Sequence, residues 1–125
     1  MKKIIYNVDG LSKGGPYSHV VEAGGFLFVS GVIPMDIDKE SVITDNIQQA
    51  TKLVLNNIKR ALASVGSNLE KVVKVTVFLR NMDDFNSMNE VYKTFFSDMP
   101  PARSCVAVKG IPANAPIEME VIAIK

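Results

Sequence analysis

The strongest apolar repeat lies in the middle of the chain, where apolar residues recur every three or four positions across residues 44–65. This spacing places them on one side of an α-helix. The stripe consists of Ile47, Ala50, Val54, Ile58, Ala61, Leu62 and Val65. Thr44 or Asp45 can cap the start of this helix, and Gly66 supplies the left-handed residue that often ends one. A shorter pattern predicts a second helix at residues 84–96.

The other apolar stretches are short and rich in β-branched residues, which is typical of strands. They predict strands at residues 2–7, 20–23, 26–30, 72–80, 104–109 and 117–124. Gly24 and Gly25 predict a tight hairpin between two of them, because such turns need positive φ angles. The polar segment 34–41 is expected to be a turn. In the strand at 72–80, alternation predicts one face made of Val73, Val75, Val77 and Leu79.

The elements follow one another in the order βββαβαββ, which predicts one α+β domain spanning residues 1–125 with a mostly antiparallel sheet. Two helices of this length can cover only one face of such a sheet. Yet apolar residues occur on both faces, since Ile122 and Ile124 share a face with Glu118 and Glu120. Proteins rarely leave such a surface open to water. We therefore expect another copy of the chain to cover it.

Composition limits the classes of partner. The chain has 125 residues, with 14 basic and 13 acidic side chains and a net charge of +1. This balance offers no basic surface for nucleic acid or an anionic membrane, and no stretch approaches the roughly 20 apolar residues of a membrane span. Cys105 is the single cysteine, and the amino terminus lacks a signal-peptide pattern. We expect a cytoplasmic protein.

Few residues have the arrangement of a catalytic or metal-binding motif. His19 is the single histidine, so a His-based triad or a zinc site has no partners, and we expect His19 to be structural. Neither a metal nor another cofactor is predicted. Arg103 closely follows two prolines, which would aim its guanidinium at a small carboxylate, and Glu118 could orient or deprotonate a water. The alternative is an arginine paired with a glutamate across the sheet, and spacing does not separate the two.

A set of short motifs resembles the RidA/YjgF family over essentially the whole chain. The motifs are Gly15-Pro16-Tyr17-Ser18, Val29-Ser30-Gly31 with Ile33-Pro34, Asn57 inside the first helix, Val75-Thr76-Val77-Phe78-Leu79, Met82-Asp83-Asp84-Phe85, Met88-Asn89-Glu90-Val91-Tyr92, Pro101-Ala102-Arg103-Ser104-Cys105-Val106 and Ile117-Glu118-Met119-Glu120-Val121-Ile122-Ala123. Several are weak alone, but their order and separations are specific. The resemblance implies a chorismate-mutase-like α+β fold with two helices packed on one face of the sheet. It also implies a homotrimer with active sites between subunits.

The resemblance further implies an activity, the cofactor-free hydrolysis of reactive 2-imino acids or their enamines to 2-keto acids and ammonia. The expected substrates are small carboxylates, 2-iminopropanoate and 2-iminobutanoate. By the motifs, Arg103 would bind the substrate carboxylate, Glu118 would hold the attacking water, and Cys105 would lie against the imine group. The residues expected to line or close the cleft are Tyr17, Ser30, Gly31 and Asn89.

Two other classes of function stay open. A non-enzymatic ligand-binding or chaperone-like regulator would bind small carboxylates without releasing ammonia. A different enzyme on the same scaffold, such as an endoribonuclease, agrees less well with the near-neutral charge and the lone histidine. The sequence also departs from the family pattern at His19 and Val32, where glutamine is common. These two residues could reshape the rim of the cleft and change the range of substrates.

Overall fold

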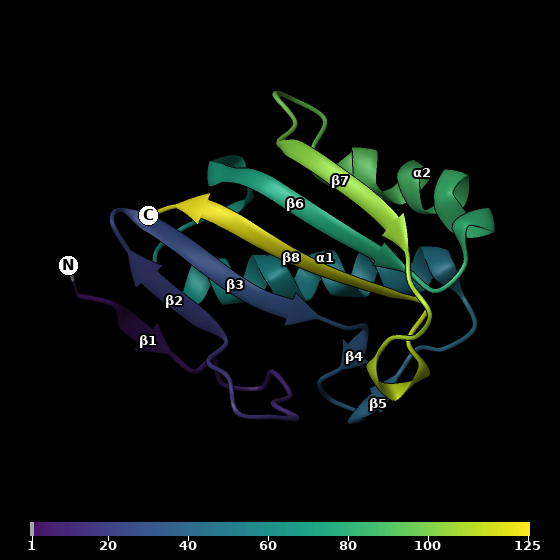
Figure 1. The fold of residues 1–125 in the computed structure, drawn as a ribbon, viewed down its shortest axis with the longest axis horizontal. Helices are drawn as coiled ribbons and strands as arrows, with labels where there is room; N and C mark the ends of the chain where they lie inside the picture. Colours follow the sequence, from purple (N-terminus) through teal and green to yellow (C-terminus); the bar gives the residue numbers. More distant parts are fainter. Residues whose placement is uncertain (1) are drawn as a thin grey trace.

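The computed structural model describes residues 2–125, and its elements follow the predicted order with one addition (Figure 1). The strands are β1 (Ile4–Tyr6), β2 (Val20–Ala23), β3 (Phe26–Val32), β4 (Met35–Asp36), β5 (Ser41–Val42), β6 (Val72–Leu79), β7 (Ala102–Ala107) and β8 (Ile117–Ile124). The helices are α1 (Ile47–Ser64) and α2 (Phe85–Phe95), with 3₁₀ turns at Leu69–Lys71, Met82–Asp84 and Pro112–Asn114. The addition is the hairpin of β4 and β5, which lies in the segment predicted to be a turn.

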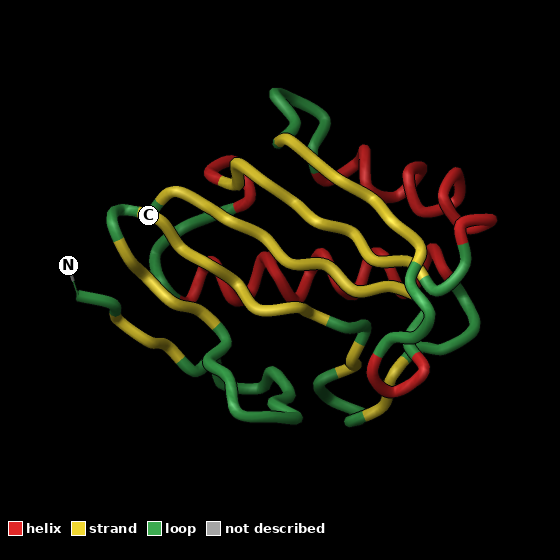
Figure 2. Tube along the Cα trace, viewed as in Figure 1, coloured by secondary structure: helices red, strands yellow, loops and turns green. Residues whose placement is uncertain are grey.

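Six strands form one sheet in the order β1-β2-β3-β8-β6-β7. Neighbouring strands are antiparallel except β6 and β7, which run parallel. Figure 1 and Figure 2 show α1 behind β3 and β8, with α2 beside β7 on the same side of the sheet. The predicted α+β fold is therefore confirmed, including its mostly antiparallel sheet and its two helices on one face.

The core lies between the two helices and the covered face of the sheet. Fully buried side chains come from α1 and from the four central strands, among them Leu27, Val54, Leu55, Ile58, Leu62, Val75, Val77, Leu79, Ile117 and Met119. Burying one such aliphatic side chain contributes about 1.5–3 kcal/mol. Burial of this one face of α1 fixes the helix against β3 and β8, the strands that carry the candidate site.

The glycine turns and the helix cap show which of the predicted element boundaries are correct. Gly24 and Gly25 have φ angles of 60° and 83°, and Gly66 has a φ of 82°, so the predicted hairpin and the predicted end of α1 are confirmed. The predicted start of α1 is wrong, because neither Thr44 nor Asp45 caps it. Asn46 does, since its side chain accepts a 2.9 Å hydrogen bond from the backbone N–H of Gln49.

Two predictions about the strands are also wrong. β7 spans Ala102–Ala107 instead of residues 104–109, because its parallel pairing with β6 already starts at Ala102 opposite Lys74. In β6, Val72 is buried and Val73 is exposed, the reverse of the predicted alternation. The register between β6 and β8 shifts between Val72 and Lys74, and such an irregularity reverses the faces on one side of it.

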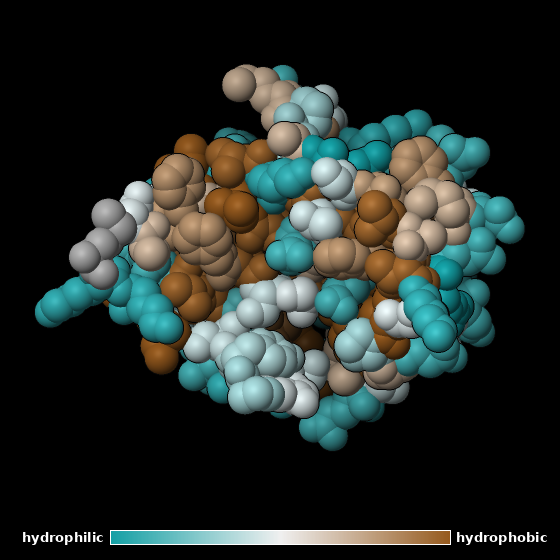
Figure 3. Space-filling model, in the orientation of Figure 1, coloured by the Kyte–Doolittle hydropathy of each residue, from teal (hydrophilic) through white to brown (hydrophobic). Residues whose placement is uncertain are grey.

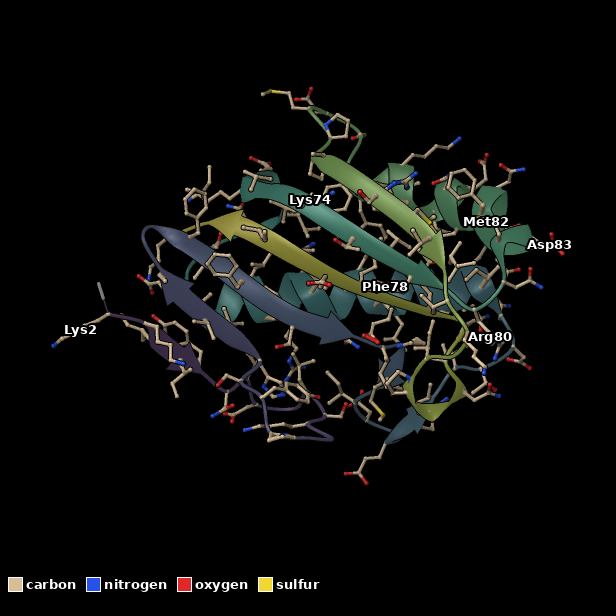
Figure 4. The ribbon with its side chains drawn as sticks, viewed as in Figure 1. Lys2, Lys74, Phe78, Arg80, Met82 and Asp83 are labelled. Atoms are coloured by element: carbon tan, nitrogen blue, oxygen red, sulfur yellow. The ribbon has the colours of Figure 1, made fainter. Side chains whose placement is uncertain are left out.

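The face of the sheet opposite the helices carries exposed apolar side chains. Phe26, Phe28, Val106 and Ile124 are each 43–47% exposed. Figure 3, which views this face, shows brown apolar atoms gathered over the strands and interrupted by polar ones. Figure 4 places Lys74 and Phe78 along β6, within this face. The sheet thus has two apolar faces, as predicted, and the helices cover one of them.

Candidate active site

The predicted site residues fall into two separate groups within one chain. Tyr17, Ser30, Gly31 and Glu118 line a cavity of about 620 Å³ beside β3 and β8. The second group lies between β7 and α2 and consists of Arg103, Cys105 and Asn89. None of these three residues lines the cavity. The structure therefore brings the predicted water-holding glutamate together with the cleft residues but not with the predicted carboxylate-binding arginine.

The strand register places the two groups on opposite faces of the sheet. Arg103 pairs with Val75 of β6, and Val75 pairs with Val121 of β8. Paired residues point to the same face, and residues three apart in a strand point to opposite faces. Glu118 lies three residues before Val121, so its side chain leaves the sheet on the face opposite to Arg103. β7 is also the edge strand, two strands away from β8.

A bulge in β3 forms the floor of the cavity under Glu118. The register of β3 against β8 shifts by one residue between Val29 and Val32, which leaves Ser30 and Gly31 out of the regular pairing. A Cβ atom on Gly31 would overlap Oε2 of Glu118 and lie 2.8 Å from its carboxyl carbon. The carboxyl group thus occupies the space that a side chain at position 31 would take. Bulges of this kind often lie beside active sites, where they redirect a side chain.

Burial raises the pKa of the half-buried Glu118 carboxyl, and the nearby charge of Glu120 raises it further. Desolvation and a like charge both disfavour the ionised form of a carboxyl group. A carboxylate whose pKa lies closer to neutrality is a stronger base than an ordinary glutamate. The electrostatics of the cavity therefore suit Glu118 for taking a proton from a bound water.

Tyr17 and Ser30 define the side of the cavity next to β2. The Ser30 hydroxyl donates a 2.6 Å hydrogen bond to the backbone C=O of Ser18, and its backbone N–H donates to the C=O of His19 at 3.0 Å. Ser30 thus fixes the start of β2. Tyr17 is 39% exposed, and its hydroxyl accepts a 3.2 Å hydrogen bond from the backbone N–H of Gly14.

In the second group, the Arg103 guanidinium is held by an amide and two aromatic rings. Its Nη1 donates a 2.7 Å hydrogen bond to Oδ1 of Asn89, and its Cζ lies 4.6 Å from the ring centre of Tyr92 and 5.6 Å from that of Phe85. The ion pairs within residues 2–125 join Lys93 to Glu90 and Lys125 to Glu22. The alternative of a cross-sheet glutamate partner for Arg103 is therefore wrong.

Tyr92 and Cys105 form the buried surroundings of Arg103. Burial raises the pKa of Tyr92 to about 12, against the opposing effect of the Arg103 charge. Its buried hydroxyl has no hydrogen-bond partner among residues 2–125. Burial also raises the pKa of the Cys105 thiol, again opposed by Arg103. A thiol with a raised pKa stays protonated at neutral pH and is a poor nucleophile.

The site residues predicted from the sequence did not include three polar residues of the cavity lining, Ser12, Lys13 and Asn57. Asn57 of α1 is only 4% exposed and lines the cavity. Its Nδ2 donates a 3.0 Å hydrogen bond to the backbone C=O of Met35. The signal was present, because an amide within the apolar stripe of a helix needs a buried partner. Most of the remaining lining is apolar and includes Leu11, Val29, Val32, Ile33 and Met35.

The part of the chain that the structure describes contains no group of three or more His, Cys, Asp or Glu side chains placed to hold a metal ion. It also contains no helix with both the length and the apolar character needed to cross a membrane.

Comparisons with known proteins identify the family and agree with the fold. The family model described as Endoribonuclease L-PSP matches residues 9–125. The crystal structure of the YjgF gene product of Escherichia coli is 29% identical, with a TM-score of 0.91 and 98% of each chain covered. The chain belongs to the RidA/YjgF family. A RutC family protein of Pyrococcus horikoshii is 42% identical over 125 residues, which cover all of this chain and 99% of that protein.

The descriptions of two further members of the family name a bound ligand and a location. The crystal structure of Escherichia coli TdcF with bound serine is 35% identical, with a TM-score of 0.90 and 99% of each chain covered. The Schizosaccharomyces pombe protein mmf2, described as mitochondrial, is 42% identical over 126 residues and covers 98% of each chain. At least one member of this family is thus described as mitochondrial, and the cytoplasmic location of this chain stays a prediction.

Proposed function

We propose that this protein hydrolyses reactive 2-imino acids, with 2-iminopropanoate and 2-iminobutanoate as substrates, to 2-keto acids and ammonia. The observation that carries the proposal is the state of Arg103, whose guanidinium is oriented by Asn89 and Tyr92 while no carboxylate within residues 2–125 neutralises it. A fixed, uncompensated guanidinium is suited to bind a planar carboxylate through two parallel hydrogen bonds. Every expected substrate carries such a group.

The proposal requires more than one copy of the chain, because Arg103 and Glu118 lie on opposite faces of one sheet. We place the working site between subunits of a homotrimer, where β7 of one copy meets the cavity of the next. The uncovered apolar face, with Phe26, Phe28 and Ile124 exposed, supports association through the sheet.

The reaction needs one water and no cofactor. Arg103 holds the carboxylate so that the imine carbon lies over Glu118 of the neighbouring copy, which turns a chance encounter into a positioned one. Glu118 takes a proton from the water while the oxygen bonds to the imine carbon. The proton passes to the nitrogen and completes the carbinolamine. Glu118 then takes the proton of the carbinolamine hydroxyl and passes it to the nitrogen, so that the carbon–nitrogen bond breaks, ammonia leaves and the keto group forms. A positioned general base increases the rate of such a reaction by about 10²–10⁴-fold.

The test couples this protein to a dehydratase that releases the imine from serine or threonine, and follows keto acid and ammonia. We expect the wild type to speed their release and Arg103→Ala and Glu118→Gln to lose that effect. Arg103→Lys keeps the charge but not the planar fork, so it should recover only part of the rate. Lys3→Ala is the control, because it removes an exposed cation next to β1, at the opposite edge of the sheet from β7. Equal rates for wild type and Arg103→Ala would refute the proposal.

A second candidate is a non-enzymatic regulator that binds small carboxylates. The solved TdcF structure with bound serine favours it, since there a family member holds an amino acid. Calorimetry with serine and with 2-ketobutyrate separates the two functions. A regulator would bind these carboxylates through Arg103 and leave the release of ammonia at the uncatalysed rate.

A further inference from the structure

A long irregular segment, residues 7–17, closes one side of the cavity and is called the strap here. It connects β1 to β2 at the lower edge of the view in Figure 1. The strap contributes Leu11, Ser12, Lys13, Gly14 and Tyr17 to the cavity lining. Its position therefore decides the shape of the cavity and the place of the Tyr17 phenol.

The hydrogen bonds that join the strap to the rest of the protein all go to the side chain of His19, while Val8 and Leu11 of the strap also pack against the hydrophobic core. The backbone N–H of Val8 donates a 2.7 Å hydrogen bond to Nδ1 of His19, and Nε2 of His19 lies 3.0 Å from the backbone oxygen of Ser12. The other hydrogen bonds of the strap in residues 2–125 join its own residues to one another. His19 is fixed in turn, because its C=O accepts the N–H of Ser30 in β3.

These two hydrogen bonds specify the protonation state of the imidazole. A backbone N–H can only donate, so Nδ1 must present its lone pair to Val8. Nε2 then carries the hydrogen and donates it to the carbonyl of Ser12. A doubly protonated imidazolium has an N–H at both positions and would turn a hydrogen toward the N–H of Val8. His19 is only 7% exposed, so water cannot easily take over the lost bond.

We propose that His19 is a positioning residue that holds the strap, and with it Tyr17, over the cavity only while its imidazole is neutral. The Tyr17 ring stands edge-on to His19, with 6.4 Å between the ring centres. The titratable side chains that line the same cavity are Lys13 and Tyr17 from the strap and Glu118 from β8. The lining residues from β3, β4, α1 and the Pro112–Asn114 turn are uncharged.

Hydrogen exchange of the backbone amides tests this without any assay of activity. The exchange is measured at about pH 5 and at about pH 8. After correction for intrinsic rates, we expect strap opening in the wild type to increase about tenfold from the upper to the lower of these pH values. His19→Ala should show the faster exchange of the strap amides at both pH values. Amides of α1 should remain protected throughout, which shows that the fold is intact.

Two conservative variants separate titration from structure. His19→Asn places an amide oxygen where Nδ1 accepts, and His19→Gln places an amide nitrogen where Nε2 donates; neither group titrates in this range. Each should keep part of the strap protection and lose its pH dependence. Ionisation of Glu118 is common to all variants, so their difference from the wild type isolates the imidazole. Equal strap protection in the wild type at both pH values would overturn the proposal, and so would an unchanged pH response in His19→Asn.

A kinetic comparison rests on the proposed function and is read separately. At about pH 8, we expect His19→Ala to raise the KM for the imine about tenfold and leave kcat within about twofold, since the strap shapes binding and does not touch the reacting bond. His19→Asn should restore much of the KM. If the wild type hydrolyses no imine, the exchange measurements still decide the role of His19.

Discussion

Arg103 donates a short hydrogen bond from Nη1 to the side-chain oxygen of Asn89, so the guanidinium is oriented by a neutral partner. A neutral amide leaves the positive charge available to a ligand, whereas a carboxylate would neutralise it. The choice of an amide at position 89 is thus a feature of the site and not merely of helix packing.

Asn89→Asp tests this relationship, because it replaces the amide by a carboxylate of nearly the same shape. The new ion pair should compete with the substrate and raise the KM for 2-imino acids about 10- to 100-fold, the range of a charged hydrogen bond. Asn89→Ala should have a smaller effect, since it only loosens Arg103. Steady-state kinetics with the coupled dehydratase measures both, and a larger defect in Asn89→Ala would contradict the argument.

Gly31→Ala should separate activity from stability. The three atoms nearest to the added methyl group all belong to the Glu118 side chain, which can move, so the free energy of unfolding should change by less than about 0.5 kcal/mol. The displaced carboxylate should lower kcat about 10- to 100-fold, as expected for a catalytic group moved by about 1 Å. Thermal unfolding and turnover are measured on the same sample. Wild-type turnover would show that Glu118 need not lie where it does.

Tyr92→Phe should not lower the free energy of unfolding, because the buried hydroxyl that it removes has no hydrogen-bond partner in residues 2–125. We expect the free energy of unfolding to rise by about 1 kcal/mol, the scale of an unsatisfied buried group, with KM unchanged. Tyr92→Leu removes the ring beneath Arg103 as well and should raise KM. Denaturant unfolding of both variants provides the comparison. A destabilised Tyr92→Phe would mean that the hydroxyl has a partner.

The pH profile of kcat/KM should fall on the acid side at a pH above the ordinary range of a carboxyl group, because the pKa of Glu118 is raised and its base form is lost as the pH drops through that value. Glu120→Gln removes one cause of the shift and should move this fall to lower pH. Glu70→Gln, an exposed carboxylate elsewhere, is the matched control. If the pH profile of kcat/KM is the same in Glu120→Gln as in the wild type, the fall at low pH belongs to a group other than Glu118.

Phe28→Glu tests the uncovered face of the sheet. A charge placed among the exposed apolar residues should separate the copies and leave a species near 13.6 kDa in sedimentation velocity, with imine hydrolysis lost at the same time. Gln49→Glu adds the same charge on the exposed side of α1 and should leave both properties unchanged. A wild-type protein that sediments as a single chain would exclude the proposed inter-subunit site.

The elements that rest on repeating patterns could be predicted from the sequence. The predictions of α1 and of the alternation in β8 are correct because each element buries one regular face. The errors lie where regularity stops. Asn46 caps α1 although Thr44 and Asp45 are equally suitable by residue type, and the irregularity near Val73 depends on pairing with a strand far away in the sequence.

The site was predictable as a set of residues but not as an arrangement. The motifs named Glu118 and Arg103 together, yet the register that places them on opposite faces involves three strands and cannot be read from spacing. The role of His19 was expected to be structural, and its two bonds to the strap agree with that expectation. Only the three-dimensional structure shows that Nδ1 of His19 accepts a hydrogen bond from the N–H of Val8, because nothing in the sequence places the strap against the imidazole ring.

The extra residue of β3 also constrains how this chain can change over evolutionary time. Loops such as that between α2 and β7 can gain or lose residues at small cost. A one-residue deletion in β3 would instead close the irregularity at Ser30 and Gly31 and restore strict alternation. The backbone at position 31, which leaves room for the Glu118 carboxyl because glycine has no side chain, would then be displaced. We therefore expect related sequences to keep the length of this strand even where its apolar residues are exchanged.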